Sequence, residues 1–206
     1  MKQSTAAFRK VLAKDPKMKM ILGQLDEPLL EKNNKIYLRI CRSILSQQLS
    51  VKVARVLYQR FLDLYEDREP TAQQILETPV ETFRGIGFSR PKSGYIHNVC
   101  NFFIVNKITD RRLHKMDNEE VIDLLTQIKG VGRWTVEMIL MYSLAREDVF
   151  PIDDLGIRNA MIKLYGIKET DKKKLYKKLN KISSGWAPYR TYGCMYLWDW
   201  LDAGGL

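Results

Sequence analysis

Two helices joined by a short glycine turn constrain the fold of this chain more than any other sequence feature. The first helix has apolar residues at intervals of three and four, which places them on one face; they are Val121, Leu124, Leu125 and Ile128. Asp117 followed by Glu120 is typical of a capping box at a helix start. Gly130-Val131-Gly132 then ends this helix, and a second amphipathic helix follows at once. Such a turn leaves backbone amides unpaired, so it can bind an anion such as a DNA phosphate.

Composition indicates a globular protein with a polyanionic partner. The 206 residues suffice for one sizeable domain or two small lobes. Hydrophobic residues make up 45% and charged residues 28%, which is ordinary for a soluble domain. The formal net charge of +10 favours an acidic partner, although charge alone does not separate DNA from RNA or an acidic membrane surface.

The remaining periodic segments predict an all-α fold. Residues 36–40 alternate like a strand, but they also fit a helix, and no second strand is present to pair with them. Cys41, Cys100 and Cys194 lie far apart, which is typical of buried thiols in a reducing compartment. The N-terminus lacks an apolar signal core, and no segment has the length of a membrane span. We therefore expect an intracellular protein without membrane association.

Three polar segments have both structural and functional interpretations. Asp153-Asp154 precedes a helix, where one carboxylate would serve as a cap and the second could face a cleft. Residues 46–50 form a polar turn between two helices, and this turn could simply be a cap. Around Gly85 and Gly87, basic residues including Lys92 indicate either a phosphate contact or an ordinary surface turn.

The segment from Ile128 to Thr135 resembles the helix-hairpin-helix of DNA repair glycosylases, and Pro151-Ile152-Asp153-Asp154 lies about twenty residues on, where that superfamily has its catalytic aspartate. From Asp15-Pro16 to Trp198 the chain is similar to the alkylpurine (3-methyladenine) DNA glycosylase II branch. The resemblance implies two helical lobes with a cleft between them. One would comprise residues 36–150, with the hairpin at about 117–144, and the other 1–35 plus 151–206.

The same resemblance implies an enzyme of base excision repair that flips out an alkylated purine and hydrolyses its N-glycosidic bond. Asp154 would be the catalytic residue, and Trp134, Trp198 and Met138 would line the base pocket. Met138 stands where a relative has an aromatic residue, so the pocket could differ in shape.

Double-stranded DNA with damaged bases is the implied partner. By the family pattern, Gln48 or its neighbour Gln47 would fill the gap left by the extruded base. The other implied DNA-binding residues are Gly85, Gly87, Lys92, Lys129, Gly130, Gly132, Arg133 and Thr135. We expect a monomer, located in the cytoplasm or nucleoid of a prokaryote or the nucleus of a eukaryote.

Bifunctional relatives carry a nucleophilic lysine at the position of Trp134, so the enzyme should be monofunctional and leave an abasic site. Only Cys194 lies near the C-terminus, where other relatives have four cysteines for an iron–sulfur cluster, so no cluster is expected. By family analogy, the backbone carbonyls of Thr126, Ile128 and Val131 could hold a sodium or potassium ion, the only cofactor anticipated.

Two alternatives remain open from the sequence. The protein could be a glycosylase for another damaged or mismatched base, such as oxidised guanine. It could also be a non-catalytic hairpin module that only binds DNA. Substrate profiling would distinguish the first alternative from an alkylpurine glycosylase. DNA binding without base release would favour the second alternative.

Overall fold

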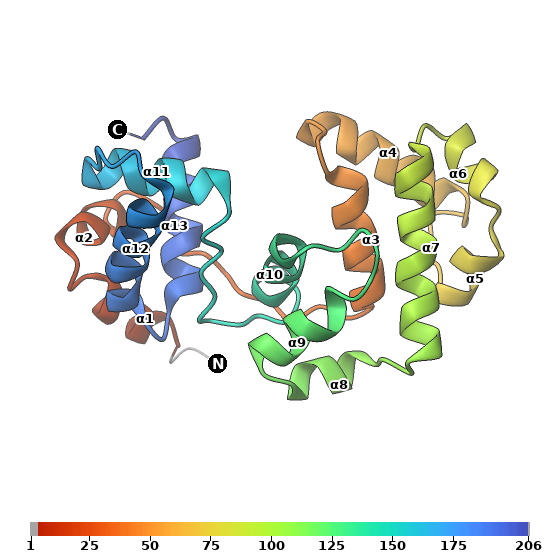
Figure 1. The fold of residues 1–206 in the computed structure, drawn as a ribbon, viewed down its shortest axis with the longest axis horizontal. Coiled ribbons are helices and arrows are strands. Elements are labelled where there is room, and N and C mark those ends of the chain that lie inside the picture. Colours follow the sequence, from red (N-terminus) through yellow and green to blue (C-terminus); the bar gives the residue numbers. More distant parts are fainter. Residues whose placement is uncertain (1–3, 206) are drawn as a thin grey trace. The chain divides into compact units, whose positions relative to one another are not determined.

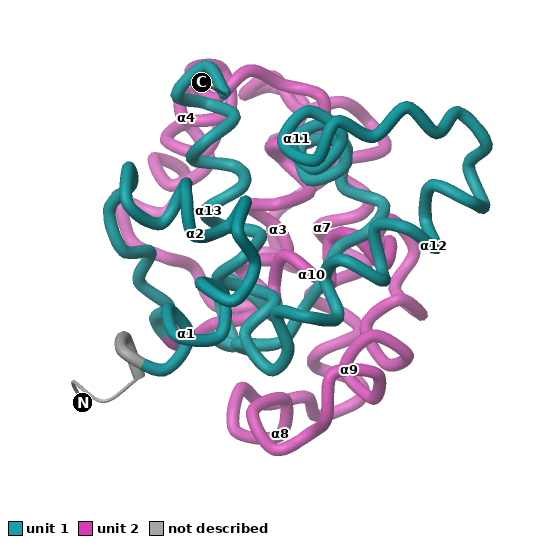
Figure 2. The backbone as a smooth tube through the Cα atoms, turned by 90° about the vertical axis from the view of Figure 1, so that its left-hand side faces the viewer, with its two compact units in different colours: residues 1–31, 140–206 teal, residues 32–139 magenta. Residues whose placement is uncertain are grey.

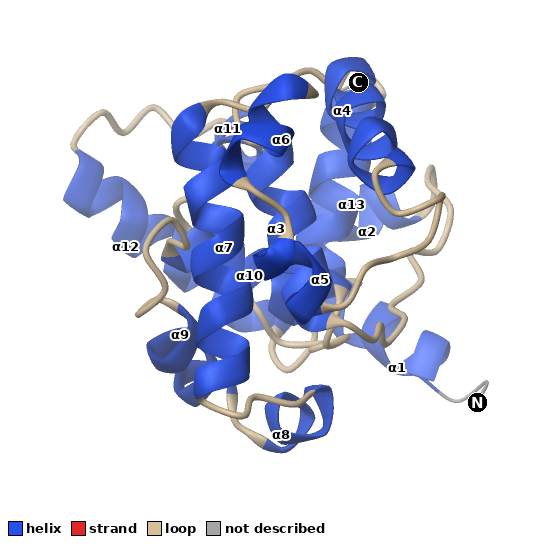
Figure 3. Cartoon of the chain, turned by 90° about the vertical axis from the view of Figure 1, so that its right-hand side faces the viewer, coloured by secondary structure: helices blue, strands red, loops and turns tan. Residues whose placement is uncertain are grey.

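A computed structural model describes residues 4–205, so residues 1–3 and 206, assigned from the sequence to the second lobe, lie outside the described part. Within residues 4–205 the chain forms thirteen α-helices and one short 3₁₀ helix, and no strand occurs there (Figure 1, Figure 3). The all-α prediction is therefore confirmed. No helix among these residues combines the length and apolar character that crossing a bilayer requires.

The chain divides into two compact units, which Figure 2 shows in different colours: residues 1–31 with 140–206, and residues 32–139. We call them the terminal unit and the central unit. The sequence-based boundaries lie at 35/36 and 150/151, whereas contacts group the chain at 31/32 and 139/140. Residues 147–149, which the sequence-based division places in the central lobe, are hydrogen-bonded within the terminal unit. Val149 donates its amide to Oγ1 of Thr191 at 3.0 Å, and Thr191 donates its own amide to the carbonyl of Glu147 at 2.9 Å.

The central unit is organised around its longest helix, α7. Its elements are α3 (Ile36–Ser46), α4 (Val51–Asp63), α5 (Ala72–Glu77), α6 (Val80–Gly85), α7 (Arg90–Val105), α8 (Asp110–Lys115), α9 (Asn118–Leu125) and most of α10 (Arg133–Tyr142). Helix α7 packs against α3 and α5, and their facing residues, such as Ile40, Ile44 and Ile96, are fully buried. A capping box of Thr71 and Gln74 begins α5.

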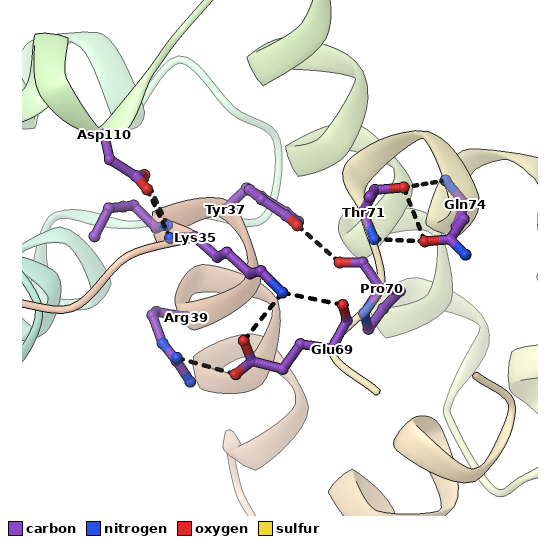
Figure 4. Close-up of polar contacts among 9 residues, drawn as sticks. Lys35, Tyr37, Arg39, Glu69, Pro70, Thr71, Gln74 and Asp110 are labelled. Carbon is purple, nitrogen blue, oxygen red and sulfur yellow. Dashed lines mark hydrogen bonds and ion pairs between the residues drawn. The ribbon is translucent and has the colours of Figure 1, made fainter. Parts of the chain in front are cut away.

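Charged side chains from other elements hold the start of α3, as Figure 4 shows. Lys35, the residue before α3, has a left-handed backbone with φ of 56° and provides no side-chain cap. The carboxylate of Asp110 replaces that cap, because it accepts the amides of Lys35 at 2.7 Å and Ile36 at 3.0 Å. Glu69 pairs with Lys35 and Arg39 beside it. An anion at a helix N-terminus is also favoured by the helix dipole.

The terminal unit contains α1 (Ser4–Leu12), α2 (Pro16–Leu22), α11 (Leu155–Tyr165), α12 (Lys172–Ser183), the 3₁₀ helix η1 (Ser184–Trp186) and α13 (Arg190–Asp202). Asp15 caps α2, and Pro16 occupies its first turn. Asp15 also accepts hydrogen bonds from the hydroxyl of Tyr165 at 2.6 Å and the indole of Trp186 at 3.2 Å, which ties both ends of the chain together. Helix α11 packs against α13 within this unit.

Candidate functional site

The glycine turn between α9 and α10 has the tight geometry that the sequence predicts. Asp117 and Glu120 form the capping box of α9. Gly130 has φ of 102°, and an added Cβ would lie 2.3 Å from the ring of Tyr95, so only glycine fits there. Gly132 has no atom within 4 Å of its would-be Cβ. Its lack of a side chain is therefore not required by packing and leaves open space beside the amides at the start of α10.

Arg133 and Thr135 lie at the first turn of α10 with partners from the protein itself. Arg133 donates to Glu119 at 2.9 Å and to the buried Glu137 at 3.1 Å. The hydrogen bond to Glu119 is the main reason that the pKa of Arg133 is raised. The guanidinium thus joins the two helices of the hairpin. Thr135 is buried, and its hydroxyl accepts from the side-chain amide of Gln47 at 3.5 Å.

The polar turn between α3 and α4 lies against the second hairpin helix. Gln47 ends α3, and Gln48 follows with a left-handed backbone of φ 59° and an exposed side chain. Together with Ser43, Ser46 and Trp134, these glutamines line a surface pocket of about 370 Å³. The structure therefore brings Gln47, Gln48 and the predicted pocket residue Trp134 together.

Lys92, a predicted DNA contact, has backbone partners in the same turn. Its ammonium donates to the carbonyl of Gln47 at 2.6 Å and to that of Leu45 at 3.0 Å. Partial burial lowers the pKa of Lys92. Nearby, Gly87 has φ of 107° and closes the turn before α7, whereas nothing lies within 4 Å of a Cβ added at Gly85.

The two aspartates before α11 have different environments. Asp154 caps the helix, because its Oδ1 accepts the amide of Ile157 at 2.8 Å, and the same oxygen accepts the indole Nε1 of Trp198 at 3.0 Å. Asp153 is exposed and accepts the hydroxyl of Tyr176 at 2.7 Å. From the sequence, we expected one of these aspartates to cap the helix and the other to face a cleft. In the structure the cap is Asp154 itself, the residue predicted to be catalytic.

Comparisons with known proteins show the family to which this chain belongs. The sequence model described as HhH-GPD superfamily base excision DNA repair protein matches residues 41–184, which include the hairpin and Asp154. The chain belongs to the HhH-GPD superfamily. It is 38% identical to DNA-3-methyladenine glycosylase 1 of Schizosaccharomyces pombe over 164 residues, covering 79% of this chain and 71% of the relative.

A second relative and one solved structure are also similar to the chain. One is an alkylbase DNA glycosidase-like protein, mag2, of the same yeast, at 36% identity with 79% of this chain and 76% of that protein covered. The other is the structure of the yeast 3-methyladenine DNA glycosylase Mag1 in complex with abasic DNA. It has 33% identity and a TM-score of 0.83, covering 94% of this chain and 95% of that one.

In this HhH-GPD protein, two residues around Asp154 were not found from the sequence. Gly156 lies where an added Cβ would be 2.9 Å from Nε1 of Trp198, so its small size lets the indole reach the carboxylate. Tyr142, at the end of α10, has its ring centroid 6.1 Å from that of Trp198. Desolvation raises the pKa of Tyr142 to about 12, and the carboxylates of Asp199 and Asp154 contribute to this rise. A glycine at the second position of a helix could have indicated a close contact there, whereas no sequence pattern indicates a role for Tyr142.

The candidate residues divide between the two units. Gln47, Gln48, Lys92, Trp134, Met138 and the hairpin glycines lie in the central unit, whereas Asp154 and Trp198 lie in the terminal unit with Tyr142 and Gly156. Met138 is half-buried, one helical turn beyond Trp134. Among residues 4–205 no cluster of three or more His, Cys, Asp or Glu side chains could hold a metal ion. The three cysteines are buried free thiols.

Proposed function

We propose that this protein is a monofunctional DNA glycosylase that hydrolyses the N-glycosidic bond of alkylated purines of the 3-methyladenine and 7-methylguanine type. The observation that carries the proposal is the carboxylate of Asp154, fixed by the α11 amide and by Trp198. The chain's similarity to yeast DNA-3-methyladenine glycosylase 1 supports the substrate class.

The chemistry requires a fixed negative charge. A base within a duplex is inaccessible, so the nucleotide must first be flipped out, at a cost of a few kcal/mol. Positive charge then develops on the sugar as the glycosidic bond breaks. Asp154 would stabilise this charge and orient or deprotonate the attacking water. Its two hydrogen bonds at Oδ1 restrict rotation of the carboxylate, so little reorganisation is needed during the reaction.

Aromatic side chains support the choice of a cationic base. Trp134, which is 39% exposed, and the partly exposed Trp198 offer ring faces. Such faces attract an alkylated purine that carries positive charge, through stacking and cation–π interaction. A cationic base also leaves readily, so the mechanism does not depend on a general acid. Met138, half-buried one helical turn beyond Trp134, would contact the same base as Trp134.

DNA binding is assigned to the central unit. Phosphates would approach the amides of the turn at Gly130 and Gly132, assisted by Lys129, Arg133 and Thr135. Gln48, exposed beside Trp134, would enter the helical stack in place of the extruded base, with Gln47 anchored beneath it on Thr135. Gly85 and Gly87, at the turn before α7, would form a second contact region.

Strand cleavage is not part of the proposed reaction. The position two residues after Gly132 is Trp134, which has no amine to form a Schiff base with the sugar. Arg133 and Lys129 do not occupy the required position. The product should therefore be an intact strand with an abasic site. Introducing Trp134→Lys need not create cleavage, because a nucleophilic lysine also needs a tuned pKa and correct placement.

The hairpin has backbone carbonyl oxygens of the type that binds a monovalent cation. Carbonyl oxygens, as at Thr126, Ile128 and Val131, are ligands suited to hard cations. The carbonyl of Ile128 already accepts the amide of Val131 at 2.9 Å, and its second lone pair could serve an ion. Bound there, sodium or potassium would add positive charge facing a phosphate. We further propose a monomer that acts where the cell keeps its DNA, in a nucleoid or nucleus.

The decisive experiment measures base release from methylated duplex DNA. Free 3-methyladenine or 7-methylguanine, together with a strand that breaks only after alkaline treatment, would support the proposal. Release of neither base would contradict it, and duplexes with oxidised or mismatched bases would then test the wider glycosylase activity.

A second candidate is a protein that binds DNA without cutting the glycosidic bond. The observation in favour of this candidate is the chain's similarity to a relative that is named only glycosidase-like. Tight binding to an abasic-site duplex, combined with no release from any damaged duplex, would establish this candidate instead.

A further inference from the structure

Helix α3 is held at both ends by charged side chains from distant parts of the chain. At its N-terminus the anion is Asp110. At its C-terminus the cation is Lys92, which reaches carbonyls 45 and 47 residues away in sequence. Each charge has the sign that the helix dipole favours at that end. The last carbonyls of a helix lack intrahelical partners, and the ammonium of Lys92 satisfies two such groups.

Lys92 is placed for this task by α7. Ser89 caps α7 by accepting the amide of Lys92, and the neighbouring Ser93 is fully buried. None of the ion pairs formed among residues 4–205 includes Lys92. Its ammonium is therefore directed to neutral backbone groups rather than to a carboxylate or to open solvent. This differs from the exposed lysines of α12, which are typical of a solvated face.

The turn that Lys92 binds has a conformation that needs support. Gln48 has φ of 59°, which is uncommon for a residue with a side chain and persists when the surroundings hold it. Leu49 closes the turn with an amide hydrogen bond to Ser46 at 3.2 Å. Lys92 binds the carbonyl directly before Gln48, so it fixes the direction in which the Gln48 side chain leaves the backbone.

We propose that Lys92 is a positioning residue that holds the Gln48 turn in the geometry needed for insertion into the DNA stack. This inference rests on the proposed function, because insertion matters only for a protein that extrudes a base. It replaces the sequence-based role of Lys92 as a phosphate contact. The two roles predict different effects of the same substitution.

The test uses Lys92→Met, which keeps the aliphatic stem and removes the ammonium. We expect the single-turnover rate of base release to fall about tenfold, with affinity for undamaged duplex and its salt dependence unchanged. Lys92→Arg should restore part of the rate. Lys115→Met, which removes an exposed charge from α8, is the matched control and should behave like wild type. A phosphate contact would instead weaken undamaged-DNA binding and reduce the salt slope by about one.

A double-mutant cycle identifies the residue through which Lys92 acts. If Lys92 acts by placing Gln48, then Lys92→Met should add little to the loss already caused by Gln48→Ala. Fully additive losses would overturn the proposal. Hydrogen exchange of residues 46–49 should also become faster in Lys92→Met, and unchanged exchange would contradict a bracing role even if that variant were slightly less stable overall.

Insertion can be measured without catalysis, which separates this proposal from the proposed function. A duplex with a tetrahydrofuran abasic analogue beside 2-aminopurine reports insertion through fluorescence. Wild-type protein should change the signal, and Lys92→Met and Gln48→Ala should each reduce that change. An equal signal from Lys92→Met and wild type would overturn the positioning role, whether or not the wild type releases a methylated base.

Discussion

The indole nitrogen of Trp198 and the amide of Ile157 donate to the same oxygen of Asp154, at 3.0 and 2.8 Å. The aromatic residue proposed to cover the base therefore also orients the proposed catalytic carboxylate. Gly156 permits this contact, because any side chain there would meet the indole. Under the proposed function, this one hydrogen bond would couple substrate recognition to charge stabilisation.

Replacing Asp154 by Asn should abolish base release while leaving DNA binding nearly intact. Asn caps a helix about as well as Asp, so the fold should persist without the negative charge. We expect a loss of at least about 100-fold in single-turnover rate. Asp153→Asn, at the exposed neighbour, should remain close to wild type. An Asp154→Asn variant that retains the wild-type rate would show that the catalytic assignment is wrong.

Gly156→Ala should impair catalysis more than folding. The added methyl carbon would lie 2.9 Å from Nε1 of Trp198 and 3.1 Å from Oδ1 of Asp154, displacing one or both. Misplacement on this scale should slow base release roughly 10- to 100-fold. Gly94→Ala is the matched control, since nothing lies within 4 Å of its Cβ and alanine favours a helix. Equal rates for both variants would exclude a role for the close approach.

Alanine should affect different properties at the two hairpin glycines: stability at Gly130 and DNA binding at Gly132. Gly130→Ala should lower the free energy of unfolding by about 2 kcal/mol or more, because of its positive φ and the ring of Tyr95. Gly132→Ala should leave thermal stability unchanged but weaken DNA binding about tenfold, if a phosphate approaches the α10 amides closely. Normal affinity in Gly132→Ala would place the phosphate elsewhere.

Salt dependence tests whether the positive charge serves DNA binding. Affinity for duplex should fall steeply between low and moderate salt, as it does when phosphates are neutralised. Lys129→Gln, at the hairpin, should reduce the slope by about one, whereas Lys19→Gln, on the exposed side of α2, should not. A flat response in the wild type would disprove an electrostatic contribution.

The pair of Asp148 and Arg190 predicts an acid-sensitive contribution to stability. Partial burial alone would raise the pKa of Asp148, but hydrogen bonds from Arg190 outweigh it and leave the pKa below its ordinary value of 3.8. The carboxylate therefore stabilises the fold above pH 3.8, and this contribution is lost as the pH falls through the lowered folded-state pKa. Asp148→Asn should be less stable at neutral pH and converge with wild type in acid. A constant difference across pH would contradict this linkage.

Local signals made much of the helical framework predictable. The capping box of Asp117 depends on Glu120, three positions away, and it forms as expected. The partners of Lys92 and Arg133 could not be predicted in the same way. Lys92 binds carbonyls more than forty residues away, and backbone carbonyls carry no sequence signature. Arg133 pairs with Glu119 across the turn, so a cation read as a DNA contact is also a link between helices.

The candidate site was predictable in its residue types and only partly in its geometry. A carboxylate before α11 and an aromatic on α13 could be chosen from the family pattern. That Asp154 serves as helix cap and indole acceptor at once depends on the packing of α11 against α13. The proximity of Tyr142 to Trp198 likewise follows from tertiary structure, since 56 residues separate them and neither periodicity nor spacing relates them.

The division of functional residues between the two units has an evolutionary consequence. The glycine turn, the Gln48 turn and Lys92 all belong to residues 32–139, whereas Asp154, Trp198 and Gly156 belong to the other unit. Under the proposed function, substitutions around Gly156 would alter the surroundings of Asp154 and Trp198 without changing the folded unit to which DNA binding is assigned. A descendant of such a protein could then lose the proposed hydrolysis and keep the proposed DNA binding.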